Sequence, residues 1–181
     1  FNLYSLEIVN EYRNIMRRLI IVVFIFISSF TTNIFAEVKI GIILGFTGPI
    51  ETLTPAMAAS AEIAFKEASD SGSLLGGEKI SVVRADSTCV DSAVATAVAE
   101  GVVAQGVVAI MGADCPGVTS AIASDVAVPN GVVMISPSAT SPGLTTLDDK
   151  GYFFRTAPSD ARGGQILADI TNDRKVKSVA I

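Results

Sequence analysis

Two cysteines, Cys89 and Cys115, constrain this 181-residue chain more than any other feature, because it contains no other cysteine. Each follows closely on a short apolar run typical of a buried β-strand. Together with the export signal described next, a count of two indicates a single disulfide bond. We expect this bond to tie two neighbouring loops together at the carboxyl edge of one sheet.

An export signal occupies residues 16–36. It opens with the positively charged Met16-Arg17-Arg18, continues as an apolar stretch over 19–30 and closes in a more polar run that ends at Ala36. This order is typical of a secretory signal peptide that is cleaved before Glu37. The alternative, a membrane anchor, is less favoured because a spanning helix needs about 20 apolar residues.

Both ends of the sequence are expected to differ from those of a mature protein. Residues 1–15 do not fit a signal peptide, and the sequence opens with Phe1. We therefore expect translation to start at Met16 and the earlier residues to be non-native upstream sequence. Residues 176–181 have the pattern of a strand that is cut short, so we expect the chain to be an N-terminal fragment.

Composition argues against several classes of function. The chain has 13 basic and 18 acidic residues and a net charge of −5, which argues against nucleic acid as a partner. It contains no histidine, so a free catalytic thiol would lack its usual activating base. A chain of this size can bury one good hydrophobic core.

Strands and helices are predicted to alternate along residues 37–181. The predicted strands cover 38–44, 80–84, 107–111, 132–135 and 176–181, with a short extended segment at 153–156. The predicted helices run from Thr54 as N-cap and Pro55 to a stop at Gly72, over 91–105, over 117–126 and from 159 onward. This alternation predicts an α/β fold, a parallel sheet covered on both faces in three αβα layers.

Two loops at the carboxyl edge of this sheet are candidate binding loops. Residues 112–117 lead into a helix whose first N–H groups are unpaired and suit a carboxylate, and Gly117 permits close approach. Residues 136–142 offer carbonyls and hydroxyls that suit an ammonium group. The hydroxyls are those of Ser136, Ser138 and Thr140. Taken separately, the first loop is equally an ordinary strand-to-helix turn, and the second resembles a common solvated Ser/Pro loop. Together they outline a site for a small zwitterion.

No cofactor or metal site is predicted. Residues 45–49 contain glycines but lack the dinucleotide fingerprint, and no phosphate-binding motif occurs. The aspartates Asp86, Asp91 and Asp114 lack the spacing of a metal-binding loop. We interpret all three as helix caps and turn residues.

Several segments carry a resemblance to a known family. They are Lys39-Ile40-Gly41-Ile42 with Thr47-Gly48-Pro49, the pair Cys89 and Cys115, residues 135–142 and residues 154–160. In these segments the chain resembles the type I periplasmic solute-binding proteins of branched-chain amino acid ABC transporters, the Leu/Ile/Val-binding proteins. The resemblance implies two α/β lobes, with residues 37–156 as the first lobe and 157–181 as a hinge crossing and the start of the second.

The resemblance also implies a set of ligand-binding residues. They are Leu53, Cys115, Pro116, Gly117, Ser138, Ala139 and Thr140. The family holds the ligand carboxylate on the loop after the second cysteine, usually with a serine where this chain has Pro116. We expect the N–H of Gly117, together with Thr140, to replace the carboxylate contacts that Pro116 cannot make. Ser138 and Thr140 match positions that supply a carbonyl to the ammonium and a hydroxyl to the ligand, and Leu53 replaces an aromatic.

The implied function is that of a substrate-binding component of an ABC importer. It captures a small aliphatic amino acid, branched-chain by expectation, in the periplasm of a Gram-negative bacterium and presents it to an inner-membrane permease. The implied protein is a monomer without cofactor and not an enzyme. Alternatives are the sensing lobe of a receptor, an amide or urea-type ligand, and an exported enzyme on a Rossmann-like sheet, which the lack of histidine disfavours.

Overall fold

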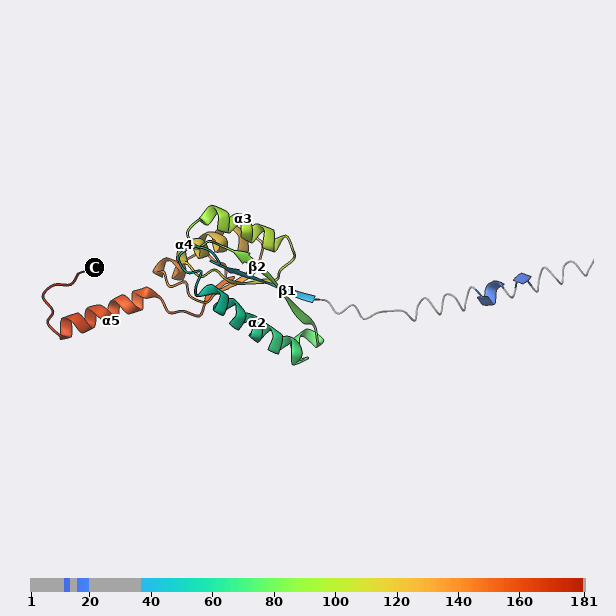
Figure 1. The fold of residues 1–181 in the computed structure, drawn as a ribbon, viewed down its shortest axis with the longest axis horizontal. Coiled ribbons are helices and arrows are strands. Elements are labelled where there is room, and N and C mark those ends of the chain that lie inside the picture. The colour runs from blue at the N-terminus through green and yellow to red at the C-terminus, as the bar shows by residue number, and fades with distance from the viewer. Residues whose placement is uncertain (1–11, 14–15, 20–36, 181) are drawn as a thin grey trace, which may run out of the picture. The chain divides into compact units, whose positions relative to one another are not determined.

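The computed structural model describes residues 12–13, 16–19 and 37–180. The chain divides into two compact units, residues 1–35 and 36–181, and the second is described here (Figure 1). Most of the predicted upstream segment (1–15) and signal peptide (16–36) lies outside the described residues. In the described part, no helix is long and apolar enough to cross a membrane.

The second unit is built on a five-stranded sheet in the order β2-β1-β3-β4-β5. Its strands are β1 (Glu37–Leu44), β2 (Lys79–Asp86), β3 (Ala109–Gly112), β4 (Val133–Ser136) and β5 (Phe153–Arg155). Each neighbouring pair runs parallel. The predicted parallel sheet is therefore confirmed, and the segment predicted only as extended at 153–156 supplies a fifth strand.

The helices follow the predicted alternation. They are α2 (Thr54–Asp70), α3 (Ser92–Val103), α4 (Pro116–Ile122) with a π-helical continuation η2 (Ala123–Ala127), and α5 (Asp160–Asp173), with short 3-10 turns η1 (Leu74–Gly76) and η3 (Pro142–Thr145). Asp91 is the N-cap of α3 and accepts the N–H groups of Ala93 and Val94 at 3.0 and 3.1 Å, which confirms its predicted role as a cap.

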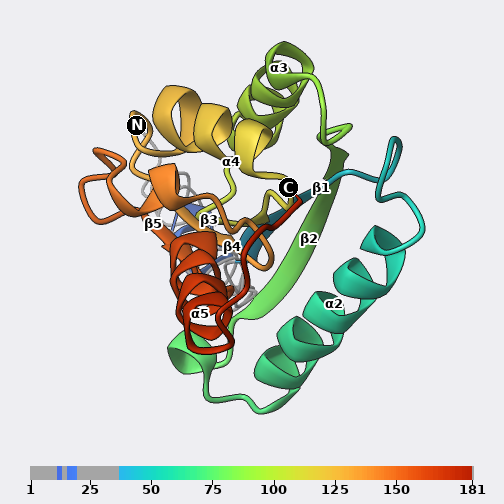
Figure 2. The ribbon, with the colours of Figure 1, turned by 90° about the vertical axis from the view of Figure 1, so that its left-hand side faces the viewer.

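Helices cover both faces of the sheet, α3 and α4 on one and α2 on the other (Figure 2). Successive residues of β1 point to opposite faces, so Ile43 packs with α3 and α4 while Ile42 and Leu44 pack with α2. On α3, buried residues recur at helical spacing and include two alanines, which let the helix approach closely. They are Ala95, Ala99 and Val102. The predicted three-layer arrangement is confirmed.

The face that carries α2 is only partly covered by the described residues. Helix α2 contacts β1 and β2. Farther along the sheet, Ile135 of β4 and its β5 neighbour Phe154 are 42% and 53% exposed. A shallow apolar cavity of about 200 Å³ lies beside Phe65 of α2. It is lined by Ile40, Phe65, Ala109, Ile110, Met111 and Ile135.

The prediction of Thr54 as the N-cap of α2 is wrong. Leu53 is the N-cap, and Thr54 is the first residue of the helix, followed by Pro55 in the first turn. The hydroxyl of Thr54 is fully buried and donates to the carbonyl of Gly45 at 2.9 Å. Thr54 therefore fastens the loop after β1 rather than the helix end. The predicted stop is correct, because Gly72 follows the C-cap with a φ of +66°.

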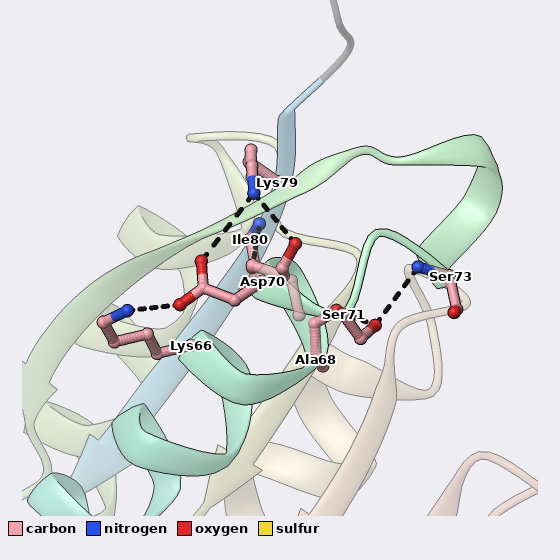
Figure 3. A network of polar contacts seen from close by, with 8 residues as sticks. Lys66, Ala68, Asp70, Ser71, Ser73, Lys79 and Ile80 are labelled. Atoms are coloured by element: carbon pink, nitrogen blue, oxygen red, sulfur yellow. Dashed lines mark hydrogen bonds and ion pairs between the residues drawn. The ribbon is translucent and has the colours of Figure 1, made fainter.

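The end of α2 is joined to the start of β2 by a polar network (Figure 3). The hydroxyl of Ser69 accepts a hydrogen bond from the N–H of Ile80 at 2.9 Å. The backbone carbonyl of Ser69 accepts one from Nζ of Lys79, also at 2.9 Å. Asp70 pairs with Lys66 on the same helix and lies 3.8 Å from Lys79. These contacts fix where β2 begins, so the register of β2 against β1 is set at this end.

The strand predicted at 176–181 is wrong over its described part. Residues 176–180 have no regular structure, and no sheet pairing in the described chain includes them. Helix α5, which precedes them, has no buried side chain. A strand needs a neighbour for its N–H and C=O groups, and the described residues provide none here.

Candidate functional site

The loops that follow β1, β2, β3 and β4 all leave the same edge of the sheet, because the strands are parallel. A disulfide between Cys89 and Cys115 joins the loop after β2 to the loop after β3, with the two Cα atoms 5.3 Å apart. The predicted disulfide is thus confirmed. Since Cys115 is the N-cap of α4, the bond fixes the point where this helix begins.

A buried carboxylate connects further loops at this edge. Asp114 is 3% exposed. Its Oδ2 accepts the N–H of Gly45 at 2.7 Å, and its Oδ1 accepts the N–H of Cys115 at 2.8 Å. Its carbonyl accepts the hydroxyl of Ser138 at 3.1 Å. Asp114 lies in the loop between β3 and α4, and the sequence did not reveal that it links the loops after β1, β3 and β4.

Asp86, at the end of β2, organises the loop after β1 in a similar way. Its carboxylate accepts the hydroxyl of Thr47 at 2.6 Å and the N–H groups of Thr47 and Thr88 at 3.3 and 2.9 Å. Burial alone would raise the pKa of Asp86, but hydrogen bonds from Thr47, Thr88 and Phe46 together outweigh it and lower this pKa. Asp86 was predicted to be a cap or turn residue; it is instead the last residue of β2, and its carboxylate holds the turn that follows.

The two predicted binding loops lie side by side. The hydroxyl of Ser136 is buried, donates to the carbonyl of Ala113 and accepts the N–H of Ala139 at 3.0 Å. Together with the bond from Ser138 to Asp114, these contacts join the loop after β4 to the loop that leads into α4. A small ligand that touches one loop can therefore touch the other.

The start of α4 presents free backbone donors. The N–H of Thr119 makes the first intrahelical bond, to the carbonyl of Cys115 at 2.9 Å. The N–H groups of Gly117 and Val118 precede it and so have no intrahelical acceptor, while Pro116 has no N–H. Gly117 is exposed, and a Cβ built on it would meet nothing within 4 Å. Pro116 removes one donor and leaves the exposed N–H of Gly117 open to approach, while Val118 is 1% exposed.

The sequence missed two residues that hold the loop after β4. Arg155, the last residue of β5, donates from Nη1 to the carbonyl of Ser141 at 2.8 Å and from Nη2 to the hydroxyl of Thr145 at 2.5 Å. Asp160, the first residue of α5, accepts the hydroxyl of Thr140 on Oδ2 at 2.8 Å. Both lie within the segment 154–160 that carried the family resemblance, and Arg155 ends a strand, which was the available signal.

The structure brings six of the seven predicted ligand residues together on two adjoining loops. They are Cys115, Pro116, Gly117, Ser138, Ala139 and Thr140. Ala139 is fully buried, and its N–H and carbonyl are already bonded to Ser136 and Arg155, so it is not exposed to a ligand in this structure. Leu53 lies on the loop after β1 and is 61% exposed. None of its hydrogen bonds within the described part of the chain reaches the other six.

Metal binding finds no support in the described residues. No group of three or more His, Cys, Asp or Glu side chains there is placed to hold an ion. Asp86, Asp91 and Asp114 each bond to backbone N–H groups instead.

The chain is similar to a known protein family and to several known proteins. The family model described as "Receptor family ligand binding region" matches residues 56–181. A Leu/Ile/Val-binding protein homolog 3 of Brucella melitensis biotype 1 is 30% identical over 153 residues, which cover 84% of this chain and 40% of that protein. The chain spans about two fifths of the length of the curated relatives that it matches.

Solved structures with the same fold include two that hold branched-chain amino acids. The substrate-binding protein LivJ of Streptococcus pneumoniae, in complex with isoleucine, is 32% identical with a TM-score of 0.61 over 69% of this chain and 35% of that one. A substrate-binding protein of Desulfitobacterium hafniense, in complex with Leu, is 30% identical with a TM-score of 0.62 over 77% of this chain and 39% of that one.

Proposed function

The chain belongs to the family of receptor-type ligand binding regions, and from this premise we propose that it forms the first lobe of a substrate-binding protein of an ABC importer. The ligand is a small aliphatic amino acid, in keeping with relatives named for leucine, isoleucine and valine. The protein acts in the periplasm as a monomer, after removal of the signal peptide at 16–36, and delivers its ligand to a membrane permease. It makes and breaks no bond.

The observation that carries this proposal is the junction of the two loops through Ser136, Ser138 and Asp114. The first loop offers the exposed N–H of Gly117, at the start of α4, to the ligand carboxylate. The second offers the carbonyl of Ser138 and the hydroxyl oxygen of Thr140 to the ammonium. A zwitterion matches both sets of partners at once, and neither set requires an added charge.

Two residues adapt this site to the chain's own ligand. Pro116 supplies neither N–H nor hydroxyl, so the carboxylate rests on backbone donors alone, among them the N–H of Thr140, which has no hydrogen-bond partner within the described chain. Leu53, exposed at the same edge, offers an apolar surface to an aliphatic side chain. A second lobe then closes over the ligand, because the closed state makes the better contacts with it.

Titration calorimetry on the full-length protein tests the proposal. The ligands are leucine, isoleucine, valine and alanine, with leucinamide and urea as probes of the alternative ligand class. We expect at least one amino acid to bind, and Thr140→Ala to weaken it by roughly tenfold or more, the equivalent of one lost hydrogen bond of about 1.4 kcal/mol. Thr96→Ala, on α3 away from these loops, is the matched control.

Each outcome of this titration is decisive. Binding of no amino acid overturns the proposed function, and binding of urea or leucinamide alone shifts the ligand to the amide class. Unchanged affinity in Thr140→Ala removes this residue from the site. A second candidate function, the sensing lobe of a receptor, is favoured by the description of the family model itself. A transmembrane or signalling domain encoded downstream in the same gene distinguishes it from the transport role.

A further inference from the structure

The hydroxyl of Thr140 has its single proton engaged. A hydroxyl carries one donor and two acceptor lone pairs. That of Thr140 donates to Oδ2 of Asp160 at 2.8 Å, and the N–H of Asp160 donates back to the carbonyl of Thr140 at 3.0 Å. The pair joins the loop after β4 to the first residue of α5. While it is intact, the oxygen of Thr140 faces any further partner as an acceptor only.

The backbone around Thr140 is held as well. One arm of the Arg155 guanidinium donates to the carbonyls on either side of this residue, of Ala139 at 3.4 Å and of Ser141 at 2.8 Å. The other arm bonds the hydroxyl of Thr145. Because a β-branched side chain has few rotamers, Thr140 is left with little freedom besides the rotation of its hydroxyl proton. Asp160 sets that rotation.

We infer that Asp160 is a positioning residue that determines the specificity of the site. It directs the Thr140 proton away from the ligand, and an ionised acceptor makes this hydrogen bond stronger than one to a neutral group. The Thr140 oxygen then accepts from a ligand that donates protons, such as an ammonium group. A ligand with a methylene in that place leaves the oxygen without this partner. The inference rests on the proposed function, because it requires Thr140 to face the ligand.

If Asp160 had a purely structural role, its loss would affect the ligand affinities differently. Asp160 lies in the first turn of α5, where a negative charge stabilises the helix. However, Ser159 already caps this helix by accepting the N–H of Ala161 at 3.3 Å. If Asp160 served only the helix or its junction with the sheet, its loss would weaken every ligand equally. The ratio of two affinities separates the two roles.

The experiment measures that ratio in the full-length protein. Leucine and 4-methylpentanoate, the same molecule without its ammonium group, are titrated into the wild type, Asp160→Ala and Asp173→Ala, the last being a control at the exposed end of α5. We expect Asp160→Ala to weaken leucine by about tenfold or more with little change for 4-methylpentanoate. The selectivity ratio then falls by about tenfold, while Asp173→Ala leaves it unchanged.

The remaining outcomes oppose the inference. Equal weakening of both ligands, or an unchanged ratio, overturns the role of Asp160 and leaves the proposed function intact. A wild type that binds none of leucine, isoleucine, valine and alanine overturns the proposed function and the inference with it; if one of them binds in place of leucine, that amino acid and its deaminated analogue form the test pair. If Asp160→Ala does not fold, Asp160→Asn replaces it. This variant keeps the acceptor but removes the charge, and we expect the ratio to fall by about threefold; no fall in the ratio again counts against Asp160.

Discussion

Oδ2 of Asp114 accepts the backbone N–H of Gly45 at 2.7 Å, across 69 positions of the sequence. The other carboxylate oxygen is equally engaged, by the N–H of Cys115 at 2.8 Å. Both bonds are made by a side chain that is 3% exposed, so water contributes little to its solvation. The loops after β1 and β3 are therefore held at a common edge by one buried group.

Replacing this carboxylate with an amide is expected to be costly. In Asp114→Asn, one of the two oxygens becomes an NH2 group that faces a backbone N–H, so one bond is lost and a buried donor is left unsatisfied. We expect the free energy of unfolding to fall by about 2–3 kcal/mol, measured by urea denaturation of the full-length protein. Asp125→Asn, at an exposed position of η2, is the control. A change below about 0.5 kcal/mol would contradict this role.

The disulfide is expected to contribute mainly through the unfolded state. It closes a loop between residues 26 positions apart. The double variant Cys89→Ser, Cys115→Ser is predicted to lose about 3–4 kcal/mol of unfolding free energy. Denaturation with and without a reductant checks this, because the reductant should lower the stability of the wild type and leave the variant unchanged. Equal stability of both proteins under oxidising conditions would refute the prediction.

Gly112 is expected to tolerate no side chain. Its φ is +136°, and a Cβ added there would lie 2.0 Å from the carbonyl oxygen of Ile43. Gly112→Ala is predicted to reduce the unfolding free energy by more than about 3 kcal/mol or to prevent folding. Gly101→Ala is the matched control, since Gly101 lies inside α3 with open space around it. We expect this control to stabilise the protein by up to about 1 kcal/mol.

Asp86 is expected to make stability depend on acid pH. Hydrogen bonds lower its pKa below the ordinary value of 3.8, so its ionised form is favoured in the folded state. The resulting stabilisation is present above pH 3.8 and is lost as the pH falls through the lowered pKa. The difference in unfolding free energy between the wild type and Asp86→Asn should therefore decrease as the pH falls below 3.8. Urea titrations between pH 7 and pH 3 measure it, and a constant difference would exclude this contribution.

Much of the fold could be predicted from local pattern. The run from Val38 to Leu44 is almost uniformly apolar, as a strand buried on both faces must be. Asp91 precedes a helix of small and β-branched residues and caps it as expected. The prediction failed at Thr54, whose hydroxyl finds the Gly45 carbonyl rather than its own helix. It also failed at 176–180, where an apolar pattern has no neighbouring strand in the described chain.

Part of the candidate site could also be predicted from the sequence, and part could not. The loops were found from sequence, because hydroxyls and glycines after apolar runs mark the carboxyl edge of a parallel sheet. The roles of Arg155 and Asp160 were not, since nothing near them in sequence shows that they face the loop around Thr140. The buried position of the Ala139 side chain was equally invisible.

The amino-acid order alone determined the alternation of strands and helices and hence the parallel sheet, because hydrophobic periodicity is a property of a few neighbouring residues. It also determined the pairing of Cys89 with Cys115, because the chain has only these two cysteines. Only the tertiary structure decided which polar groups meet. Asp114 reaches Gly45, and Thr140 gives its proton to Asp160, over separations of 69 and 20 positions. Such partners are brought together by the three-dimensional course of the loops between the strands and helices, and a hydrogen bond depends on that geometry to within a fraction of an ångström.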